Sequence, residues 1–362
     1  MTAPYISDRK ADHIRICATR NVGSRRSTGF EDVHLVHRSL PEMNMDEVNT
    51  SCAFMGHQLL LPLVIEAMTG GAPPAERINQ RLAAAARHLQ LAMGVGSQRI
   101  ALENPAFEAS FRVVRETAPD AFLLANIGAP QLAKGYGPDE AKKAVEMISA
   151  NALAIHVNTA QECAQLEGEP LAKGVIDKIS EIVKQVDVPV IVKETGAGIS
   201  AEDAVKLERV GVSGIDVAGV GGTDWARVES YRKGSGRKES RNQLFHGWGI
   251  PTAASLVEVT QSTKLIAIAS GGVRDGLQIA KSITLGASAA GLARPLLRPA
   301  MKSRQAVEKA IRVVHRELKT AMFLTGSKTI TDLQGAPLVL TGDTYHWLSQ
   351  RGFDTRRYAR RE

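Results

Sequence analysis

The chain has 362 residues, 44% apolar and 23% charged, a balance that fits a globular protein with a sizeable core and excludes a largely disordered chain. Its longest apolar stretches, such as Leu59 to Val64, are far too short to span a bilayer, so no membrane partner is expected. The net charge, 45 − 38 = +7, either favours anionic ligands or simply keeps the surface solvated.

The cysteines and the polar start of the chain predict a cytoplasmic protein. The three cysteines are scattered and odd in number, which fits neither a disulfide framework nor a metal-ligand spacing. The first ten residues lack the apolar segment of a signal peptide. Much of the excess positive charge sits in Arg232–Arg241 and Arg356–Arg361, but aromatic residues make up only 4% of the chain, so we expect no nucleic-acid partner.

Eight short runs of apolar and β-branched residues predict eight strands. Between most of them lie stretches with helical periodicity, for example over 75–89, 141–149, 175–186, 201–210 and 276–285. Continuous apolar strands that alternate with helices indicate a parallel sheet covered on both faces, and eight such units favour a closed barrel. The expected strands are Leu61–Met68, Leu91–Val95, Phe122–Ile127, Ala152–Val157, Val188–Val192, Gly214–Ala218, Leu265–Ala269 and Ala289–Ala293.

The predicted fold class is therefore α/β, a (β/α)8 barrel with an N-terminal extension and a C-terminal helical tail. No low-complexity linker divides the series of strands and helices. We expect an extension over 1–58 that contributes to a substrate site, the barrel over 59–300, and a helical segment and tail over 301–362 packed on the barrel.

Each predicted strand ends in a polar or glycine-rich turn. The strands of a parallel barrel open on one rim at their carboxyl ends, and catalysis sits there in barrel enzymes. Glycines that merely make tight turns explain any single turn well, but explain all eight together less readily. The turns are 69–71 (TGG), 96–99 (GSQR), 128–130 (GAP), 158–162 (NTAQE), 193–196 (KETG), 219–223 (GVGGT), 270–272 (SGG) and 293–295 (ARP).

The last three turns suit a phosphate group. In Gly219–Thr223 and Ser270–Arg274, the missing Cβ atoms let backbone N–H groups approach an anion, and the helix after each turn is expected to add its positive end. Barrels often bind a phosphate after strands seven and eight.

A second basic cluster points to another anion. Arg9, Lys10 and His13 form an RKxxH pattern, and Ser97–Arg99 follow the second strand. Arg forks match phosphate oxygens, whereas Lys acts as a point charge. An N-terminal Arg-Lys pair taken alone is more often solvated surface charge. Two anion sites would mean two phosphorylated ligands, such as a cofactor and a substrate.

The fourth and fifth strands end in groups that could do chemistry. Alternation places His156 and Asn158 on one face of their strand, and Gln161 and Glu162 follow. Glu162 either binds Mg²⁺, which takes one or two carboxylates plus phosphate oxygens, or caps the next helix. Lys193 ends an apolar run at the rim, where a buried ammonium group needs an anionic partner.

These residues resemble those of one family, the type 2 isopentenyl-diphosphate delta-isomerases, from about Arg9 to about Tyr358. Most of the motifs are weak individually, but together they are highly specific. They are the RKxxH start, MTGG at 68–71, GVGSQR at 94–99, HVNTAQE at 156–162, VKETGAGIS at 192–200, GVGGTDW at 219–225, WGIPTAAS at 248–255, ASGGVRDG at 269–276 and APLVLTGDTYHWLSQRG at 336–352.

The resemblance implies a TIM-barrel flavoprotein that requires reduced FMN and Mg²⁺, uses NADPH only to reduce the flavin, and forms homo-tetramers or homo-octamers. Glu162 would bind Mg²⁺, and Gln161, His156 and Asn158 would serve the chemistry. The implied cofactor residues are Ala67, Met68, Thr69, Ser97, Asn126, Lys193, Thr223, Gly272, Val273, Arg274, Ala293 and Arg294. The implied substrate residues are Arg9, Lys10, His13, Ser97, Gln98, Arg99 and Gln161. One departure is Ala218, where many relatives carry Ser or Thr, so a hydroxyl contact near the FMN phosphate is lost.

The implied reaction interconverts isopentenyl diphosphate and dimethylallyl diphosphate in isoprenoid biosynthesis. It adds a proton at the terminal alkene carbon and removes one from C2, and no pair of carboxylates or cysteines is obviously spaced for this, so the flavin is expected to carry the proton chemistry.

Two alternative functions stay open. One is an FMN barrel that oxidises small hydroxy acids, which resembles this chain around Lys193 and the SGG turn. The other is a non-catalytic barrel that binds phosphorylated ligands. A dehydrogenase of the inosinate type is disfavoured, because no Cys follows the Gly219–Gly222 loop.

Overall fold

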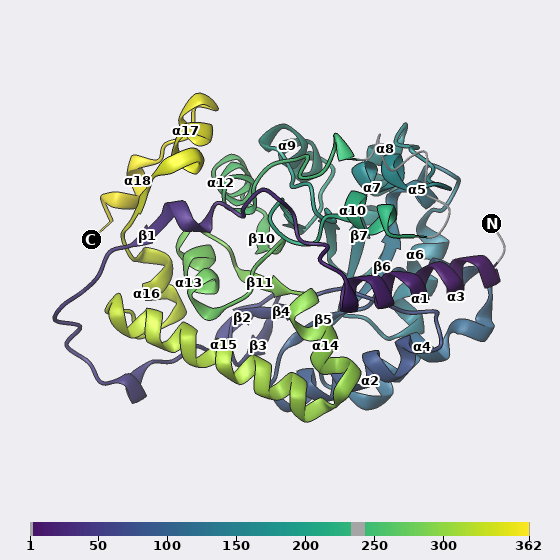
Figure 1. Cartoon of the computed structure of the whole chain (residues 1–362), viewed down its shortest axis with the longest axis horizontal. Coiled ribbons are helices and arrows are strands. Elements are labelled where there is room, and N and C mark those ends of the chain that lie inside the picture. Colours follow the sequence, from purple (N-terminus) through teal and green to yellow (C-terminus); the bar gives the residue numbers. More distant parts are fainter. Residues whose placement is uncertain (1–2, 233–242, 362) are drawn as a thin grey trace.

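The centre of the molecule is a closed barrel of eight parallel strands (Figure 1). The computed structural model describes residues 3–232 and 243–361, so all of the basic stretch 232–241 except Arg232 lies outside the described residues. All eight predicted strands are present and the predicted barrel is confirmed. In order around the barrel they are β4 (Leu63–Ile65), β5 (Ala92–Gly94), β6 (Leu123–Gly128), β7 (Ala152–His156), β8 (Val190–Lys193), β9 (Gly214–Asp216), β10 (Ile266–Ala269) and β11 (Ala289–Leu292).

The barrel closes where its last strand meets its first. Ala290 pairs with Leu63 and Leu292 pairs with Ile65, in parallel register. Because all the strands are parallel, their carboxyl ends meet at one rim, as the sequence predicts.

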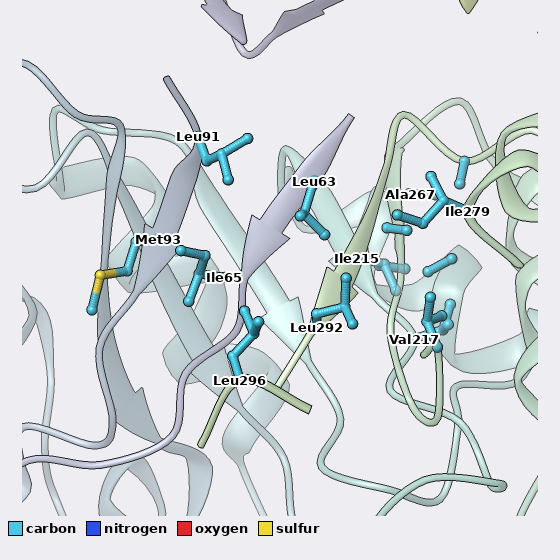
Figure 2. Close-up of a cluster of buried hydrophobic side chains, with 14 of the residues drawn as sticks. Leu63, Ile65, Leu91, Met93, Ile215, Val217, Ala267, Ile279, Leu292 and Leu296 are labelled. Atoms are coloured by element: carbon cyan, nitrogen blue, oxygen red, sulfur yellow. The ribbon is translucent and has the colours of Figure 1, made fainter. Parts of the chain in front are cut away.

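Apolar side chains fill both faces of the barrel wall. Side chains alternate along a strand, so Leu63 and Ile65 point outward, whereas Val64 belongs to the core inside the barrel. Figure 2 shows Leu63, Ile65 and Leu292 on neighbouring strands with Leu296 close by, and all four belong to the larger apolar cluster, which also contains residues of the covering helices. This double-sided burial explains why the strand sequences are almost continuously apolar.

The helices that cover the barrel include one at each of the five predicted stretches of helical periodicity, with ends that differ by a few residues, and others outside those stretches. They are α2 (Ala75–His88), α3 (Arg99–Glu103), the 3-10 helix η3 (Pro105–Phe107), α4 (Ala109–Thr117), α5 (Ala129–Leu132), α6 (Pro138–Met147), α7 (Thr159–Ala164), α8 (Val175–Gln185), α9 (Ala201–Arg209), α10 (Trp225–Ser230), α12 (Thr252–Ser262), α13 (Gly276–Thr284) and α14 (Arg294–Lys302). None of the described helices is both long and apolar enough to cross a membrane.

The first part of the chain covers both ends of the barrel. Helix α1 (Ala3–Thr19) packs on α3, α10 and α14 at the rim and is drawn in purple in Figure 1. The hairpin of β2 (Cys52–Phe54) and β3 (His57–Leu59) closes the opposite end, where the Phe54 ring meets the Phe122 ring edge-on at 5.4 Å. Two short 3-10 helices, η1 (Phe30–Asp32) and η2 (Met45–Glu47), lie between these parts.

The two ends of the chain pair with each other. Strand β1 (Val33–Leu35) and strand β12 (Leu338–Leu340) form a two-stranded antiparallel sheet outside the barrel. The long helix α15 (Arg304–Leu324) packs on α13, α14 and α2. The remaining C-terminal elements are α16 (Ile330–Gly335), α17 (Gly342–Gln350) and α18 (Arg356–Ala359).

A buried carboxylate fastens the C-terminal region to the barrel helices. Glu258 on α12 is fully buried and accepts hydrogen bonds from Trp347 Nε1 at 2.8 Å, from the Ala201 N–H at 2.9 Å and from the Arg351 guanidinium. The same guanidinium also holds the exposed carboxylate of Glu202.

Replacing Glu258 with Gln is expected to lower the free energy of unfolding by about 2 kcal/mol, because hydrogen bonds to a buried charged group are each worth roughly 1.5–3 kcal/mol. Urea unfolding measures the effect. Glu202→Gln is the matched control: it removes a carboxylate from the same arginine but at the surface, where an ion pair contributes little. Equal losses in the two variants would contradict this account.

Candidate active site

Two adjoining cavities open at the rim of the barrel. The first cavity lies over the ends of β4, β8, β10 and β11, and the second lies over β6 and β7 beside α1. Their empty volumes are about 1040 and 930 Å³, open solvent included. They share a wall made by His13, Ala67, Met68, Thr69, Lys193, Thr195 and Trp225.

One end of the first cavity is cationic. Arg274 and Arg294 line it, and the pKa of Arg294 is lowered by burial and by the nearby Arg274, Arg298 and Arg227. Helix α14 starts there, and Ala293 at its N-cap makes no side-chain hydrogen bond to the free N–H groups. A helix N-terminus next to clustered arginines is a favourable site for an anion.

The helices that follow the sixth and seventh turns start differently from α14, whose N-terminus has no side-chain cap. The N-cap carboxylates of Asp224 on α10 and Asp275 on α13 already accept backbone N–H groups of their own helices. A carboxylate therefore already lies at the start of each helix, which makes these two ends less positive than expected from the sequence. Glycines have a second role here: Gly271 has a φ of 94°, and a side chain on it would overlap the backbone of Gly219 in the neighbouring turn.

At the other end of the first cavity, Lys193 sits between two carboxylates. Its Nζ lies 2.7 Å from Asp216 Oδ2 and 3.1 Å from Glu66 Oε2. Burial would lower the pKa of Lys193, but Asp216 and Glu66 raise it above its usual value, so the side chain is a fixed cation. Lys193 and its need for an anionic partner are predicted from the sequence, whereas neither carboxylate is.

The second cavity is lined by cations from two segments. Arg9 and Lys10 come from α1, and Arg99 comes from the start of α3. The Lys10 ammonium donates a hydrogen bond to the Ser97 carbonyl at 2.7 Å, and Arg99 Nε donates to Glu103 Oε1 at 2.8 Å. Burial, together with the charges of Arg9 and Arg99, lowers the pKa of Lys10 to about 7. An anion in this cavity would relieve the repulsion between these cations.

Ion pairs fasten α1 over this cavity. His13 Nε2 lies 2.9 Å from Glu229 Oε1 on α10, and Arg232 bridges Glu229 at 2.8 Å and Glu167 at 2.6 Å. Although burial opposes it, the hydrogen bonds and charges of His13 and Arg232 lower the pKa of Glu229. The RKxxH pattern thus lies in the site because α10 offers a carboxylate to its histidine.

The end of β7 contributes a neutral histidine. His156 Nδ1 lies 2.7 Å from Asn126 Oδ1, and Asn126 Nδ2 donates to the Val95 carbonyl at 3.0 Å, which fixes the amide and places the histidine proton on Nδ1. Burial, Lys193 and Lys10 lower the pKa of His156 to about 4. His156 is therefore uncharged at neutral pH.

Next to it, three oxygen-bearing side chains form a polar group. Asn158 Nδ2 donates to Glu162 Oε1 at 2.9 Å, and the Glu169 N–H donates to Glu162 Oε2 at 2.8 Å. The buried Asn158 Oδ1 has no hydrogen-bond partner among residues 3–232 and 243–361. Gln161 Nε2 lies 3.5 Å from Glu229 Oε1. Within the same residues, no three His, Cys, Asp or Glu side chains gather as a complete metal site.

The structure brings nearly all predicted site residues to these two cavities. Gln98 is the exception: it is fully buried, its Nε2 donates to the Ala144 carbonyl, and its Oε1 accepts from the Asn126 N–H, so it holds the β5–α3 turn and does not reach a ligand. The first cavity holds Ala67, Met68, Thr69, Lys193, Thr223, Gly272, Val273, Arg274, Ala293 and Arg294, and the second holds Arg9, Lys10, His13, Ser97, Arg99, Asn126, His156, Asn158, Gln161 and Glu162.

Sequence reasoning missed four further residues of the site. Glu66 and Asp216 had a detectable signal, because each is an acidic residue within an apolar strand run, as Lys193 is a basic one. Trp225 and Glu229 lie beyond the sixth turn, and their position depends on α1 packing across the rim, which no local pattern indicates.

Comparison with known proteins gives independent evidence on the fold and the family of this chain. Residues 129–340 match the model of the FMN-dependent dehydrogenase family. The chain is similar to mandelate oxidase structures; one, with 4-Br-2-hydroxy-methylphenylacetate, has a TM-score of 0.65 at 16% identity and covers 94% of this chain and 99% of that one. At such low identity this likeness supports the barrel fold alone.

Curated relatives are much more similar in sequence. The isopentenyl-diphosphate delta-isomerase of Methanosarcina mazei is 50% identical, over 97% of this chain and 96% of the relative. The protein of the same name from Methanothermobacter thermautotrophicus is 48% identical over 98% and 99%, and that from Pyrococcus abyssi 47% over 95% of each. With this identity over nearly its whole length, and with its flavin-family match, the chain belongs to the type 2, FMN-dependent isopentenyl-diphosphate delta-isomerase family.

Proposed function

We propose that this protein interconverts isopentenyl diphosphate and dimethylallyl diphosphate, with reduced FMN in the first cavity and the Mg²⁺-bound diphosphate in the second, as a step of isoprenoid biosynthesis. The observation that carries the proposal is the shared wall. Two cavities with separate cationic ends meet at Lys193, Thr69 and Trp225, which suits two phosphorylated ligands that must touch at their reacting parts.

The residues of the first cavity fit FMN. The uncapped N-terminus of α14, with Arg274 and Arg294, would hold the phosphate, and Lys193 would face the ring as a fixed cation. Thr69 Oγ1 is buried without a hydrogen-bond partner among the described residues and could receive one from the ring. When bound, reduced FMN supplies the proton-transfer chemistry that no side-chain pair here offers. Ala218 has no hydroxyl and lies in the left-handed region at φ 34°, so neighbouring backbone groups must serve the phosphate.

The second cavity fits a diphosphate with Mg²⁺. Arg9, Lys10 and Arg99 supply charge for the phosphate oxygens. Glu162 and the unpartnered Oδ1 of Asn158 supply hard oxygen ligands, and Mg²⁺ usually completes its shell with substrate phosphates and water. The absence of a three-carboxylate cluster among the described residues agrees with a metal that arrives with the substrate.

The charges in the second cavity limit which side chains can move protons. His156 is neutral at pH 7 and its Nδ1–H is donated to Asn126, so it is a poor acid toward an alkene, and its unprotonated Nε2 is left as a hydrogen-bond acceptor. Gln161, near the shared wall, would orient the hydrocarbon end. Met68 and Trp225 would keep water from the reacting carbons.

We further propose NADPH as a reductant of the flavin, a cytoplasmic location and assembly into homo-tetramers or homo-octamers. An apolar surface supports self-association: Leu244, Phe245 and Trp248 are 82%, 56% and 65% exposed, and such groups mark contact surfaces when they cluster. Light scattering gives the mass of the assembly.

Incubation of isopentenyl diphosphate with the protein, FMN, Mg²⁺ and dithionite tests the proposed function directly. Dimethylallyl diphosphate should accumulate to an equilibrium mixture. Anaerobic bleaching of bound flavin by lactate or glycolate, without isomerisation, would instead support a hydroxy-acid oxidase. A colourless protein that cannot take up FMN would favour a non-catalytic barrel.

Glu162→Gln should lower turnover at limiting Mg²⁺ by at least about tenfold while FMN stays bound, because only the second cavity loses a metal ligand. Activity against Mg²⁺ concentration, with flavin absorbance of the same samples, measures both. Glu169→Gln is the control, since its carboxylate pairs with Lys134 and should affect neither. Parallel loss of flavin and activity in Glu162→Gln would remove Glu162 from the metal site.

The apparent KM for isopentenyl diphosphate should rise about tenfold or more from pH 7 to pH 9. The pKa of Lys10 is near 7 in the free protein, and a bound diphosphate raises it, so binding above pH 7 requires proton uptake and weakens as pH increases. Lys10→Met should raise the KM at pH 7 and flatten this dependence. Arg9→Ala should also raise the KM, but because the charge of Arg9 lowers the pKa of Lys10, the rise of the KM with pH should begin at a higher pH in this variant. A slope unchanged in Lys10→Met would show that another group titrates.

A further inference from the structure

A carboxyl group that the proposed reaction does not use lies at the floor of the first cavity. Glu66 follows β4, its side chain is 6% exposed, and it borders both the first cavity and a narrow space inside the barrel. Its Oε2 lies 3.1 Å from Lys193 Nζ, but its Oε1 has no hydrogen-bond partner in the described part of the chain. A buried oxygen without a donor is costly, so this atom needs a proton or a ligand.

The charges around Lys193 do not balance. Lys193 and Asp216 are the charged groups that face Glu66 from β8 and β9. Ser270 after β10 contributes only a hydroxyl, and Gly291 on β11 contributes no side chain. Two carboxylates and one ammonium leave an excess negative charge in a buried site, which favours protonation of one carboxylate.

Of the two carboxylates, Glu66 holds a proton more readily. Asp216 accepts from Lys193 at 2.7 Å, from Ser270 Oγ at 2.6 Å and from the Ala218 N–H at 3.3 Å. Glu66 has a single donor, and hydrogen bonds to the charged form keep a carboxyl group ionised. Burial and the neighbouring Asp216 accordingly raise the pKa of Glu66 to about 7. A side chain at position 291 would overlap Glu66 Oε1, so Gly291 leaves room for this group.

We propose that Glu66 is a proton acceptor coupled to the charge of the cofactor, taking up one proton when FMN beside Lys193 is reduced to its anionic form. This inference rests on the proposed binding of FMN in the first cavity. The reduction then balances as two electrons and two protons: one proton goes to the flavin ring and the second to Glu66. The driving force is electrostatic, because the reduced ring adds negative charge to a buried site that already has an excess of it.

The midpoint potential of the bound flavin against pH tests the proposal on the holoprotein. Each pH unit is a tenfold change in proton activity, which moves a two-electron couple by about 30 mV per proton taken up. Wild-type holoprotein should show a slope of about 59 mV per pH unit in a window that starts near pH 7, and Glu66→Gln should show about 30 mV. Free FMN in the same buffers gives the reference slope.

Glu194→Gln is the matched control. Its carboxylate is also buried at the rim, and burial raises the pKa of Glu194 to about 7 as well, but one of its oxygens accepts three backbone N–H groups. This variant should keep the wild-type slope. A wild-type slope near 30 mV throughout pH 7–9, or a slope lost in Glu194→Gln and kept in Glu66→Gln, would overturn the proposal.

Two further outcomes keep the test decisive. If Glu66→Gln does not fold, the wild-type slope and the appearance of a protonated-carboxyl C=O band in the reduced-minus-oxidised infrared spectrum of the wild type decide the question; absence of both overturns the proposal. If the protein does not bind FMN at all, the proposed function itself is wrong, and the inference about Glu66 is overturned with it.

Discussion

Closure of the barrel between β11 and β4 is the constraint on which the site depends. The parallel register that joins Leu292 to Ile65 brings the ends of the first and last strands side by side, so Glu66 and Ala67 lie next to Ala293 and Arg294 although more than two hundred residues separate them in the chain. Because all eight strands are parallel, the side chains that follow them also lie at this one rim. Without this closure, the cationic phosphate end and the Lys193 end of the first cavity would not belong to one space.

The rim has three regions that differ in their charged residues. Arginines gather where α14 begins, a lysine is fixed between two acids at the barrel axis, and a second group of cations lies under α1. Each region contains more like charge than it can neutralise by itself, which shifts the pKa values of Lys10 and Glu66 toward neutrality. Such unbalanced charge costs stability in the empty protein and is relieved when ligands of opposite charge, or protons, bind.

The barrel and most of the site follow from local sequence patterns, whereas the contacts between distant segments do not. Apolar runs such as 152–156 indicate strands because both faces are buried, and the turns after them indicate the rim. Gln98 shows the limit: its position in a turn beside Ser97 and Arg99 predicts a ligand contact, yet its amide is used to join the turn to β6 and α6. The pairing of His13 with Glu229 depends on how α1 packs, and a single sequence carries no signal for it. The acidic caps of α10 and α13 were visible in the sequence, but their effect on the helix dipole appears only when their hydrogen bonds are known.

The pairing of β1 with β12 can form only after nearly the whole chain has been synthesised. Residues 33–35 leave the ribosome early, but their partners at 338–340 emerge only when the chain is almost finished. The segment that carries Arg9 and Lys10 therefore stays tethered to an unpaired strand during nearly all of synthesis, and the contacts between these chain ends are among the most distant in sequence that the fold contains. A ribosome-bound nascent chain that stops before residue 338 would already contain the barrel and the partners of α1, but its β1 would lack β12, so the second attachment of the N-terminal segment forms only at the very end of translation.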